Sequence, residues 1–417
     1  MSEPFPAVAI IDPFSSGALF GCEARRLGLR PYAVFSGPDL PEHSLRSFRR
    51  YDFEDAHSHT DLDTTVAWLR ARGVRAVVPG TQTALGLVDV VADRLGVPGN
   101  CPATAAARAD KGQMKQRLRA KDVACAASTE SDRLADLLRW TEQIGYPVVT
   151  KPPRGFGTKG VRVCKDRAEL EAGFDYIMNL PPLYHGGRPR VLVEEYLDGE
   201  EYFINFLHRG DERQLLCVAR YEKIRTTLSA GVYRNIWSLP LAAPEAHAAA
   251  DYVCEVNRAL AVRIGINDIE FKLTSRGPRV IELNNRLPGA FVPDLIHRCS
   301  GFDCYAENLR VFLGLAPAAR GPVRYHRHFC VCCLISDAAG TVTGIEGMSV
   351  VRNLSSFVGV HFNVRVGDSI EPTTDLQSTW GLVFLVHEDP DVLREDAEIV
   401  HRALRVTTGG RDPSAGS

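Results

Sequence analysis

The sequence lacks the features that mark membrane, secreted and nucleic-acid-binding proteins. None of its apolar runs approaches the length of a membrane span. The N-terminus, MSEPFPAVAIIDPF, has no basic segment before an apolar one, so we expect no signal peptide. A net charge of -2 provides no basic surface for nucleic acid. We therefore predict neither nucleic acid nor a membrane as a partner.

The cysteines do not suggest a disulfide framework. Eleven is an odd number, and they are spread over 417 residues, which predicts a reducing cytoplasm. We interpret Cys330, Cys332 and Cys333, in the apolar segment FCVCCLI, as small buried side chains and not as a metal site. No cysteine falls in a recognisable nucleophile motif.

A dinucleotide fingerprint is also absent. An apolar strand is predicted at residues 6 to 11, then a helix from Ser15 to about Gly28 and a strand at 31 to 36, but no glycine triplet joins the first strand to the helix. We therefore expect no nicotinamide cofactor. Helices at 60 to 72 and 84 to 95, around a strand at 75 to 79, continue the alternation of a parallel sheet. Residues 1 to 100 are predicted to form one doubly wound domain.

The most informative feature present is a predicted β-hairpin at residues 268 to 289. If its turn is centred near Arg276, Glu270 lies opposite Glu282 and Asp268 lies opposite Asn284. Like charges that face each other across strands repel, so this pairing calls for a cation. Mg²⁺, held by one or two carboxylates and by substrate phosphates, suits such oxygens best. The alternative is a solvated hairpin with scattered charges.

Two further segments suggest a site for an anionic ligand. A strand at 147 to 150 leads into KPPRGFGTKGV, whose glycines allow backbone N–H groups to approach an anion while lysine and arginine add charge. A glycine turn of an ordinary hairpin is the alternative for this loop. Glu194 and Glu201 flank a turn in VLVEEYLDGEEYFINF, where exposed backbone could bind a base and a carboxylate could bind ribose hydroxyls.

In this order, the motifs resemble the ATP-grasp superfamily of carboxylate-amine ligases, and more closely its L-amino acid ligases, which make dipeptides. The resemblance rests on KPPRGFGTKGV, EEYLDGEEY, RYEK followed by VY, and GPRVIELNNRLPG, and it covers roughly residues 5 to 315. It implies an α/β ATP-grasp fold with the following parts: a Rossmann-like N-terminal domain (1–100), a helical linker (101–145), a mobile lid subdomain (146–200), a central α+β catalytic and metal-binding subdomain (201–318), a C-terminal α+β domain (319–406) and a disordered tail (407–417).

The resemblance also implies roles for individual residues. Those expected at ATP are Lys111 and Lys151 at the phosphates, Gly155, Gly157, Lys159 and Gly160 in the covering loop, Glu194, Tyr196 and Leu197 at adenine, Glu201 at ribose, and Lys223. Those expected at the metal are Glu270, Glu282 and Asn284, and the catalytic residues are Arg286 and Lys151. One departure is Asp268, where many relatives carry histidine. The loop LPGAFVPDL also differs from glycine-rich versions, and it is expected to line the acceptor pocket.

The function implied is ATP-dependent amide formation in specialised metabolism. The enzyme would activate an amino acid or related carboxylate as an acyl phosphate and couple it to an amine, releasing ADP and phosphate. ATP and Mg²⁺, as two ions or with Mn²⁺ in their place, would be the cofactors, and a homodimer is compatible with the resemblance. The alternatives are an enzyme that uses a different carboxylate or a non-amine nucleophile, and a non-catalytic nucleotide-binding protein.

Overall fold

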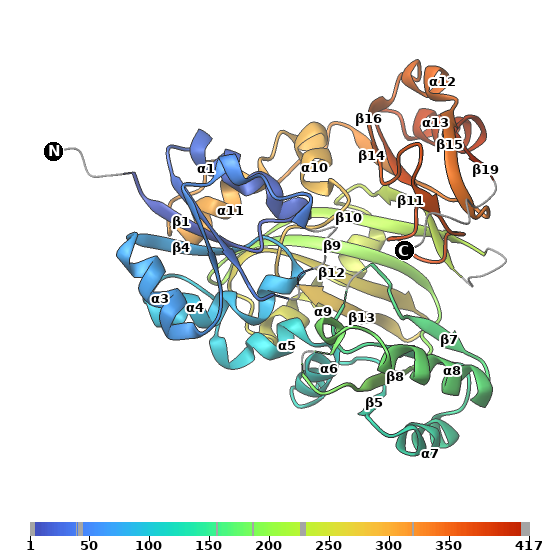
Figure 1. The fold of residues 1–417 in the computed structure, drawn as a ribbon, viewed down its shortest axis with the longest axis horizontal. Helices are drawn as coiled ribbons and strands as arrows, with labels where there is room; N and C mark the ends of the chain where they lie inside the picture. Colours follow the sequence, from blue (N-terminus) through green and yellow to red (C-terminus); the bar gives the residue numbers. More distant parts are fainter. Residues whose placement is uncertain are drawn as a thin grey trace.

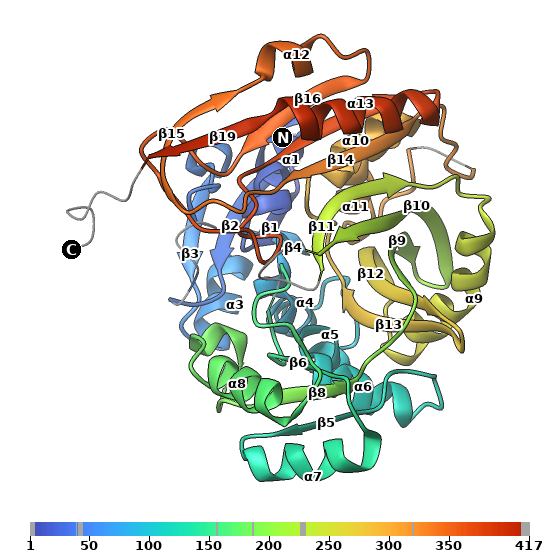
Figure 2. The ribbon, with the colours of Figure 1, turned by 90° about the vertical axis from the view of Figure 1, so that its right-hand side faces the viewer.

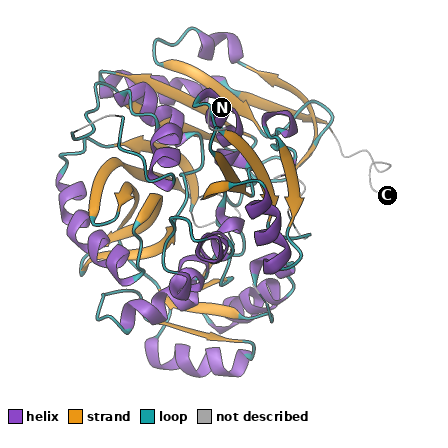
Figure 3. Cartoon of the chain, turned by 90° about the vertical axis from the view of Figure 1, so that its left-hand side faces the viewer, coloured by secondary structure: helices purple, strands orange, loops and turns teal. Residues whose placement is uncertain are grey.

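The computed structural model describes residues 5–38, 40, 45–155, 157–185, 187–225, 231–318 and 321–409. In this part of the chain the strands form four sheets, and helices lie around them (Figures 1 and 3). Among the described residues, no helix is long and apolar enough to cross a membrane.

The N-terminal sheet is parallel, as predicted from the alternation of strands and helices. The order across the sheet is β3 (Asp55–Ser58), β2 (Arg30–Phe35), β1 (Ala7–Ile11) and β4 (Val74–Pro79). Strand β1 is completely buried, which suits a continuous apolar sequence. Side chains of α3 (Leu62–Ala71) and α4 (Val88–Leu95) pack against one face of the sheet.

Two predicted helical segments differ in detail from the structure. The helix expected from Ser15 to Gly28 begins as the tight turn η1 (Ser15–Leu19) and continues as α1 (Phe20–Arg26). The predicted helical linker (101–145) contains two short helices in its first part, α5 (Ala105–Ala109) and α6 (Lys111–Arg119). Asp110 separates them because its backbone is extended and its carboxylate accepts a hydrogen bond of 3.0 Å from the N–H of Gln113, which caps α6. Lys111 is therefore the first residue of a new helix.

A small antiparallel sheet follows, at the bottom of Figure 2. Its order is β5 (Ser128–Ser131), β8 (Val191–Glu195), β6 (Val148–Lys151) and β7 (Arg162–Cys164). Helices α7 (Leu134–Ile144) and α8 (Arg167–Met178) share a hydrophobic core with it. The segment predicted as a helical linker thus contains strand β5, whose residues pair with β8.

The largest sheet has eight strands and runs from the predicted hairpin into the C-terminal part of the chain. Its order is β13 (Gly277–Asn284), β12 (Ile264–Thr274), β9 (Glu200–Arg209), β10 (Glu212–Ile224), β11 (Val232–Ser238), β14 (His328–Leu334), β18 (Gly381–His387) and β16 (Phe357–Phe362). Helix α9 (Pro244–Ala259) contributes to the core on one face, and α10 (Val292–Ser300) and α11 (Cys304–Phe312) contribute to a second core. Cys330, Cys332 and Cys333 are fully buried on β14, as predicted.

The C-terminal part adds a third antiparallel sheet, β17 (Ser369–Ile370), β15 (Gly340–Glu346) and β19 (Arg405–Gly409), with helices α12 (Met348–Arg352) and α13 (Pro390–Ala403) (Figure 2). The predicted start of the disordered tail, at residue 407, is too early, because Thr407, Thr408 and Gly409 pair with β15. Residues 410–417 lie outside the described residues.

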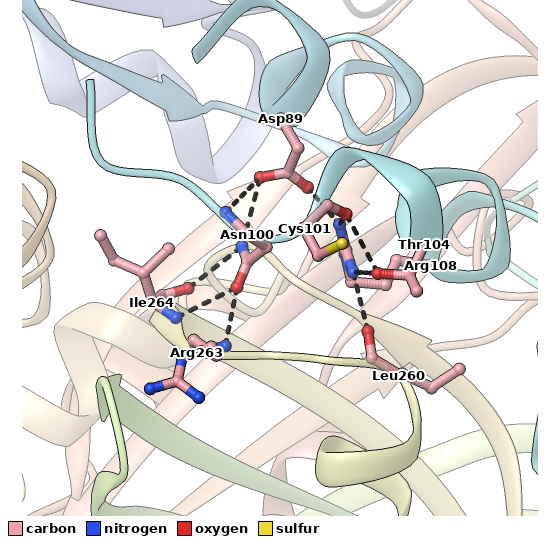
Figure 4. A network of polar contacts seen from close by, with 8 residues as sticks. All are labelled: Asp89, Asn100, Cys101, Thr104, Arg108, Leu260, Arg263 and Ile264. Atoms are coloured by element: carbon pink, nitrogen blue, oxygen red, sulfur yellow. Dashed lines mark hydrogen bonds and ion pairs between the residues drawn. The ribbon is translucent and has the colours of Figure 1, made fainter. Parts of the chain in front are cut away.

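A buried polar network joins the N-terminal sheet to the largest sheet (Figure 4). The guanidinium of Arg108 forms a 2.7 Å ion pair with Asp89 on α4 and donates a 2.7 Å hydrogen bond to the carbonyl of Leu260. The side-chain oxygen of Asn100 accepts from the N–H groups of Arg263 and Ile264, at 2.8 and 3.1 Å. The connection between α9 and β12 is thereby fixed to the helices that lead to Lys111.

We predict that this network contributes strongly to stability. The side chains of Arg108 and Asp89 are only 1% and 3% exposed, so Asp89→Ala leaves a buried charge unpaired and is expected to lower the free energy of unfolding by about 3–5 kcal/mol. Asp63→Ala, which removes the exposed ion pair with Arg94, is the control and should cost less than about 1 kcal/mol. Denaturant unfolding measures both, and equal losses would contradict a structural role for the buried pair.

Candidate functional site

The predicted pairing of the acidic hairpin is confirmed. Glu270 on β12 lies opposite Glu282 on β13, and Asp268 lies opposite Asn284. The turn lies between Thr274 and Gly277, which pair with each other. Regular pairing from that point would place Glu270 opposite Ile281, so a one-residue bulge between Glu270 and Phe271 is needed to bring Glu270 opposite Glu282. Without the bulge, Glu270 would face a residue whose side chain points to the other side of the sheet.

Glu270 has an unfavourable environment for a negative charge. Burial, the carboxylate of Glu282 and the carboxylate of Asp268 raise the pKa of Glu270 to about 8. Its hydrogen bond partner among the described residues is the hydroxyl of Tyr221, at 3.3 Å. This carboxylate is therefore largely protonated at neutral pH unless a cation lies beside it.

Glu282 is held by residues from two other parts of the chain. The ammonium of Lys111, at the start of α6, lies 3.1 Å from its carboxylate. Gln82, after strand β4, donates a hydrogen bond to the same oxygen. Both side chains also donate to the carbonyl of Gly155, at 3.1 Å from Lys111 and 2.9 Å from Gln82. The hairpin, the N-terminal sheet and the glycine loop thus meet at this carboxylate.

Asp268 and Arg286 form the next pair along the hairpin. One guanidinium nitrogen of Arg286 lies 3.0 Å from the carboxylate of Asp268 and also donates to the carbonyl of Leu287 at 2.7 Å. Asn205, on the neighbouring strand β9, donates to the other carboxylate oxygen at 3.0 Å. Burial raises the pKa of Asp268, although Arg286 and Asn205 oppose this effect. Asp268, which stands where the resemblance leads us to expect histidine, therefore orients Arg286.

The hairpin side chains fit a hard cation. Asn284 is only 2% exposed, and its side-chain oxygen has no hydrogen bond partner among the described residues. A buried acceptor without a donor is costly, and together with the carboxylates of Glu270 and Glu282 it supplies oxygen ligands alone. The described residues contain no group of three His, Cys, Asp or Glu side chains placed to hold a metal. An ion held by these side chains would have coordination positions left for substrate phosphates.

A second charge cluster lies one helical turn from Lys111. Glu194 on β8 is paired with Lys151 at 2.7 Å and with Lys115 at 3.2 Å. Burial opposes ionisation of Glu194, but the two ammonium groups lower its pKa overall. Lys115 is fully buried and also donates to the carbonyl of Val280 at 3.1 Å. Glu194 thus positions two lysines in the structure, in addition to the adenine contact that the resemblance implies.

A third cluster is centred on Glu201. Lys223 and the hydroxyl of Tyr233 both donate to its carboxylate at 2.7 Å. Burial opposes ionisation, yet these donors lower the pKa of Glu201 overall. Lys272, on strand β12 of the hairpin, donates to the carbonyl of Leu197 at 3.0 Å, and its ammonium lies 5.1 Å from the ring centroid of Tyr196. The residues predicted at adenine are thus linked to the hairpin.

The glycine loop has the backbone conformation that its composition predicts. Gly155, Gly157 and Gly160 have φ values of +135°, +63° and +77°, which favour glycine. A Cβ atom at Gly157 would lie 2.6 Å from the side chain of Gln377, so the loop packs against the C-terminal part of the chain. Lys159 lies beside α8, where the hydroxyl of Tyr176 raises its pKa.

The structure thus brings most of the predicted residues into three neighbouring clusters. Lys111, Gly155, Glu270, Glu282, Asn284 and Arg286 surround the hairpin, Lys151 joins Glu194, and Lys223 joins Glu201. Lys159 lies instead beside α8, next to Tyr176. The sequence prediction missed Gln82, Lys115 and Lys272. A signal was available for Lys115, because it follows Lys111 by four residues and so lies on the same face of α6.

Comparisons with known proteins agree with this geometry. Residues 144–294 match the family described as ATP-grasp domain, and residues 333–409 match L-amino acid ligase C-terminal domain 2. The chain is 24% identical over 412 residues to dapdiamide A synthase of Enterobacter agglomerans, covering 93% of both chains. It is 26% identical over 340 residues to human carnosine synthase 1, covering 75% of this chain but 40% of that protein.

The fold matches a solved structure over nearly the whole chain. The L-amino acid ligase of Bacillus licheniformis superimposes with a TM-score of 0.81 at 19% identity, covering 98% of this chain and 100% of that one. Two other solved structures with this fold, each with a TM-score of 0.68, contain ADP, in one case with magnesium.

We predict that metal binding at the hairpin depends on pH. If Glu270 is a metal ligand, Mg²⁺ binds its carboxylate form, and burial together with Glu282 and Asp268 raises the pKa of this group to about 8. Affinity should therefore rise about tenfold per pH unit below pH 8, level off above it, and be accompanied by proton release. Calorimetric titration with Mg²⁺ from pH 6.5 to 9, in buffers of different ionisation enthalpy, measures both effects. The same pH slope in Glu270→Gln would contradict this assignment.

Proposed function

We propose that this chain, which belongs to the ATP-grasp superfamily, is an ATP-dependent ligase that joins a carboxylate to an amine and releases ADP and phosphate. The observation that carries the proposal is the facing pair Glu270 and Glu282, next to Lys111 and the glycine loop. That arrangement gives oxygen ligands for a cation directly beside groups that bind phosphate. The similarity to synthases of dapdiamide A and carnosine supports amino acids as substrates.

Activation of the carboxylate is the step that the hairpin serves. A carboxylate is a poor electrophile, and phosphoryl transfer from ATP converts it to an acyl phosphate with a good leaving group. Bound Mg²⁺ neutralises the charge that develops on the phosphates, and Glu270, Glu282 and Asn284 are the side chains that would hold it. We propose two ions, with Mn²⁺ as an alternative.

Lysines and glycines of this chain would bind the nucleotide. Lys111 and Lys151 are proposed to contact its phosphates, and the loop from Gly155 to Gly160 to cover them with backbone N–H groups and exclude water. Glu194 is buried between Lys115 and Lys151, and its ion pair would hold Lys151 in a fixed place. Glu201, oriented by Lys223 and Tyr233, is proposed to bind the ribose hydroxyls.

Arg286 would bind the substrate carboxylate and its acyl phosphate. Among the described residues, only one terminal nitrogen of its guanidinium takes part in hydrogen bonds, so the other nitrogens can bind oxygens of the substrate. Asp268 and the carbonyl of Leu287 hold the group in place. The amine then attacks the acyl carbon, a C–N bond forms, and phosphate leaves with the electron pair of the broken C–O bond.

Assembly and location are further parts of the proposal. A homodimer and a cytoplasmic location are proposed, the latter because all eleven cysteines are free thiols in the structure. An enzyme with another carboxylate or a non-amine nucleophile is the second candidate, since Asp268 departs from the family pattern.

We predict that ADP release depends on the presence of both substrates. Purified protein should release ADP and phosphate with MgATP and particular pairs from a matrix of amino acids and amines, and mass spectrometry should find the amide. Glu282→Ala should reduce release to background because the cation loses a ligand, whereas Glu346→Ala, an exposed residue on β15, should behave as wild type. AMP and pyrophosphate as products, or no release with any pair, would contradict the proposal.

A second prediction concerns Arg286. Arg286→Gln is expected to lower kcat by about 10²–10³ with little change in the KM for ATP, because the guanidinium would stabilise charge that develops at the acyl group. Arg279→Gln is the matched control, since Arg279 lies on β13, the strand that precedes Arg286, and donates to the neighbouring carbonyl of Pro278. Steady-state kinetics with the active substrate pair separate kcat from KM. A loss confined to the KM for ATP would place Arg286 at the nucleotide instead.

A further inference from the structure

A pocket of about 260 Å³ lies at the other end of strand β9 from the nucleotide-binding clusters. It is formed by the end of β9, the turn at Gly210 and Asp211, and the last turns of α9. His208, which lines it, follows Glu201 by seven residues on the same strand. A strand rises about 3.3 Å per residue, so the two residues are about 23 Å apart along the strand. The pocket is therefore separate from the site described above.

The floor of the pocket has two buried polar groups without partners. His208 and Asn257 are 4% and 3% exposed. Nε2 of His208 and the side-chain nitrogen of Asn257 have no hydrogen bond partner among the described residues. The side-chain oxygen of Asn257 already accepts from Asn267 at 2.6 Å, so its nitrogen is the group left to bind a ligand, as a donor.

His208 can also serve as a donor while uncharged. Burial and the nearby guanidinium of Arg213 lower its pKa to about 4, so the ring is neutral at pH 7. A neutral imidazole carries one proton, and with that proton on Nε2 the ring donates a hydrogen bond. Two buried donors without acceptors fit a ligand that brings acceptor oxygens.

The mouth of the pocket carries positive charge. Arg213, which pairs with His208 across β10 and β9, and Arg258, on α9, are both exposed and form no ion pair among the described residues. Arg263 is paired with Asp211 at 3.3 Å, so these two charges offset each other. Two uncompensated guanidinium groups remain, and guanidinium binds carboxylate and phosphate groups in a bidentate manner.

We propose that this pocket binds a small oxyanion, carried as the carboxylate or phosphate group of a small metabolite, at a site separate from the catalytic hairpin. The anion contacts the donors of His208 and Asn257 on the floor and the guanidinium groups of Arg213 and Arg258 at the mouth. The volume of about 260 Å³ admits inorganic phosphate or a small dicarboxylate.

The pocket also borders the polar network that joins the N-terminal sheet to the largest sheet. Arg263 lines the pocket, and its N–H donates to Asn100 in that network (Figure 4). The carbonyl of Leu260 in the same connection accepts from Arg108, which precedes Lys111 by three residues. An anion bound here would therefore lie beside the connection between α9 and β12 that Arg108 of α5 contacts.

The test uses the imidazole signal of His208 in the full-length protein, identified by its loss in His208→Gln. Inorganic phosphate and succinate are titrated separately at constant ionic strength, and NMR follows the ring. A saturable shift is expected with at least one of them. Saturation by phosphate alone identifies a phosphate group as the ligand chemistry, and saturation by succinate alone identifies a carboxylate.

Charge variants show whether the shift arises from the proposed contacts. The double variant Arg213→Gln and Arg258→Gln should raise the dissociation constant at least tenfold, because both guanidinium groups are lost. Arg352→Gln, an exposed arginine of α12, should leave it unchanged. The thermal unfolding temperature verifies that each variant is folded. A shift that does not saturate with either anion, or equal affinity in the double variant and wild type, would overturn the proposal.

Discussion

The carboxylates of Glu270 and Glu282 face each other across the β12–β13 hairpin, and the arrangement of the surrounding elements follows from the repulsion between them. Glu282 is neutralised by Lys111, from the first turn of a helix that begins only because Asp110 interrupts the preceding one. Gln82 reaches the same carboxylate from the N-terminal sheet. Contacts from two other parts of the chain therefore converge on one pair of strands.

The other buried carboxylates of the site each have a basic partner, which leaves Glu270 as the exception. Asp268 is paired with Arg286, Glu194 with two lysines, and Glu201 with Lys223. Among the described residues, Glu270 has only the hydroxyl of Tyr221, and its pKa is raised accordingly. The neighbouring oxygen of Asn284 is likewise without a donor. A cation at this point would relieve both features, which is why the proposed chemistry is centred there.

Local patterns in the sequence were sufficient to predict the hairpin, the parallel N-terminal sheet and the glycine loop, because alternation and glycine content act over a few residues. They were insufficient where the outcome depends on distant partners. No local signal identified Gln82, which donates a hydrogen bond to Glu282, two hundred positions further along the chain. The C-terminal strands were predicted as a domain of their own, yet β14 pairs with β11 and extends the sheet that contains the hairpin. The pairing of Glu270 with Glu282 was correct only because of a bulge that the sequence pattern does not reveal.

The central claim is that the hairpin supports transfer of a phosphoryl group to a carboxylate, and oxygen-isotope transfer tests it most directly. The carboxylate substrate identified among the tested amino acids is labelled with ¹⁸O in both carboxylate oxygens and converted to the amide in the presence of MgATP. Acyl phosphate formation predicts that one labelled oxygen per turnover appears in the released inorganic phosphate, as measured by mass spectrometry. Unlabelled phosphate, or label found in AMP, would contradict the account.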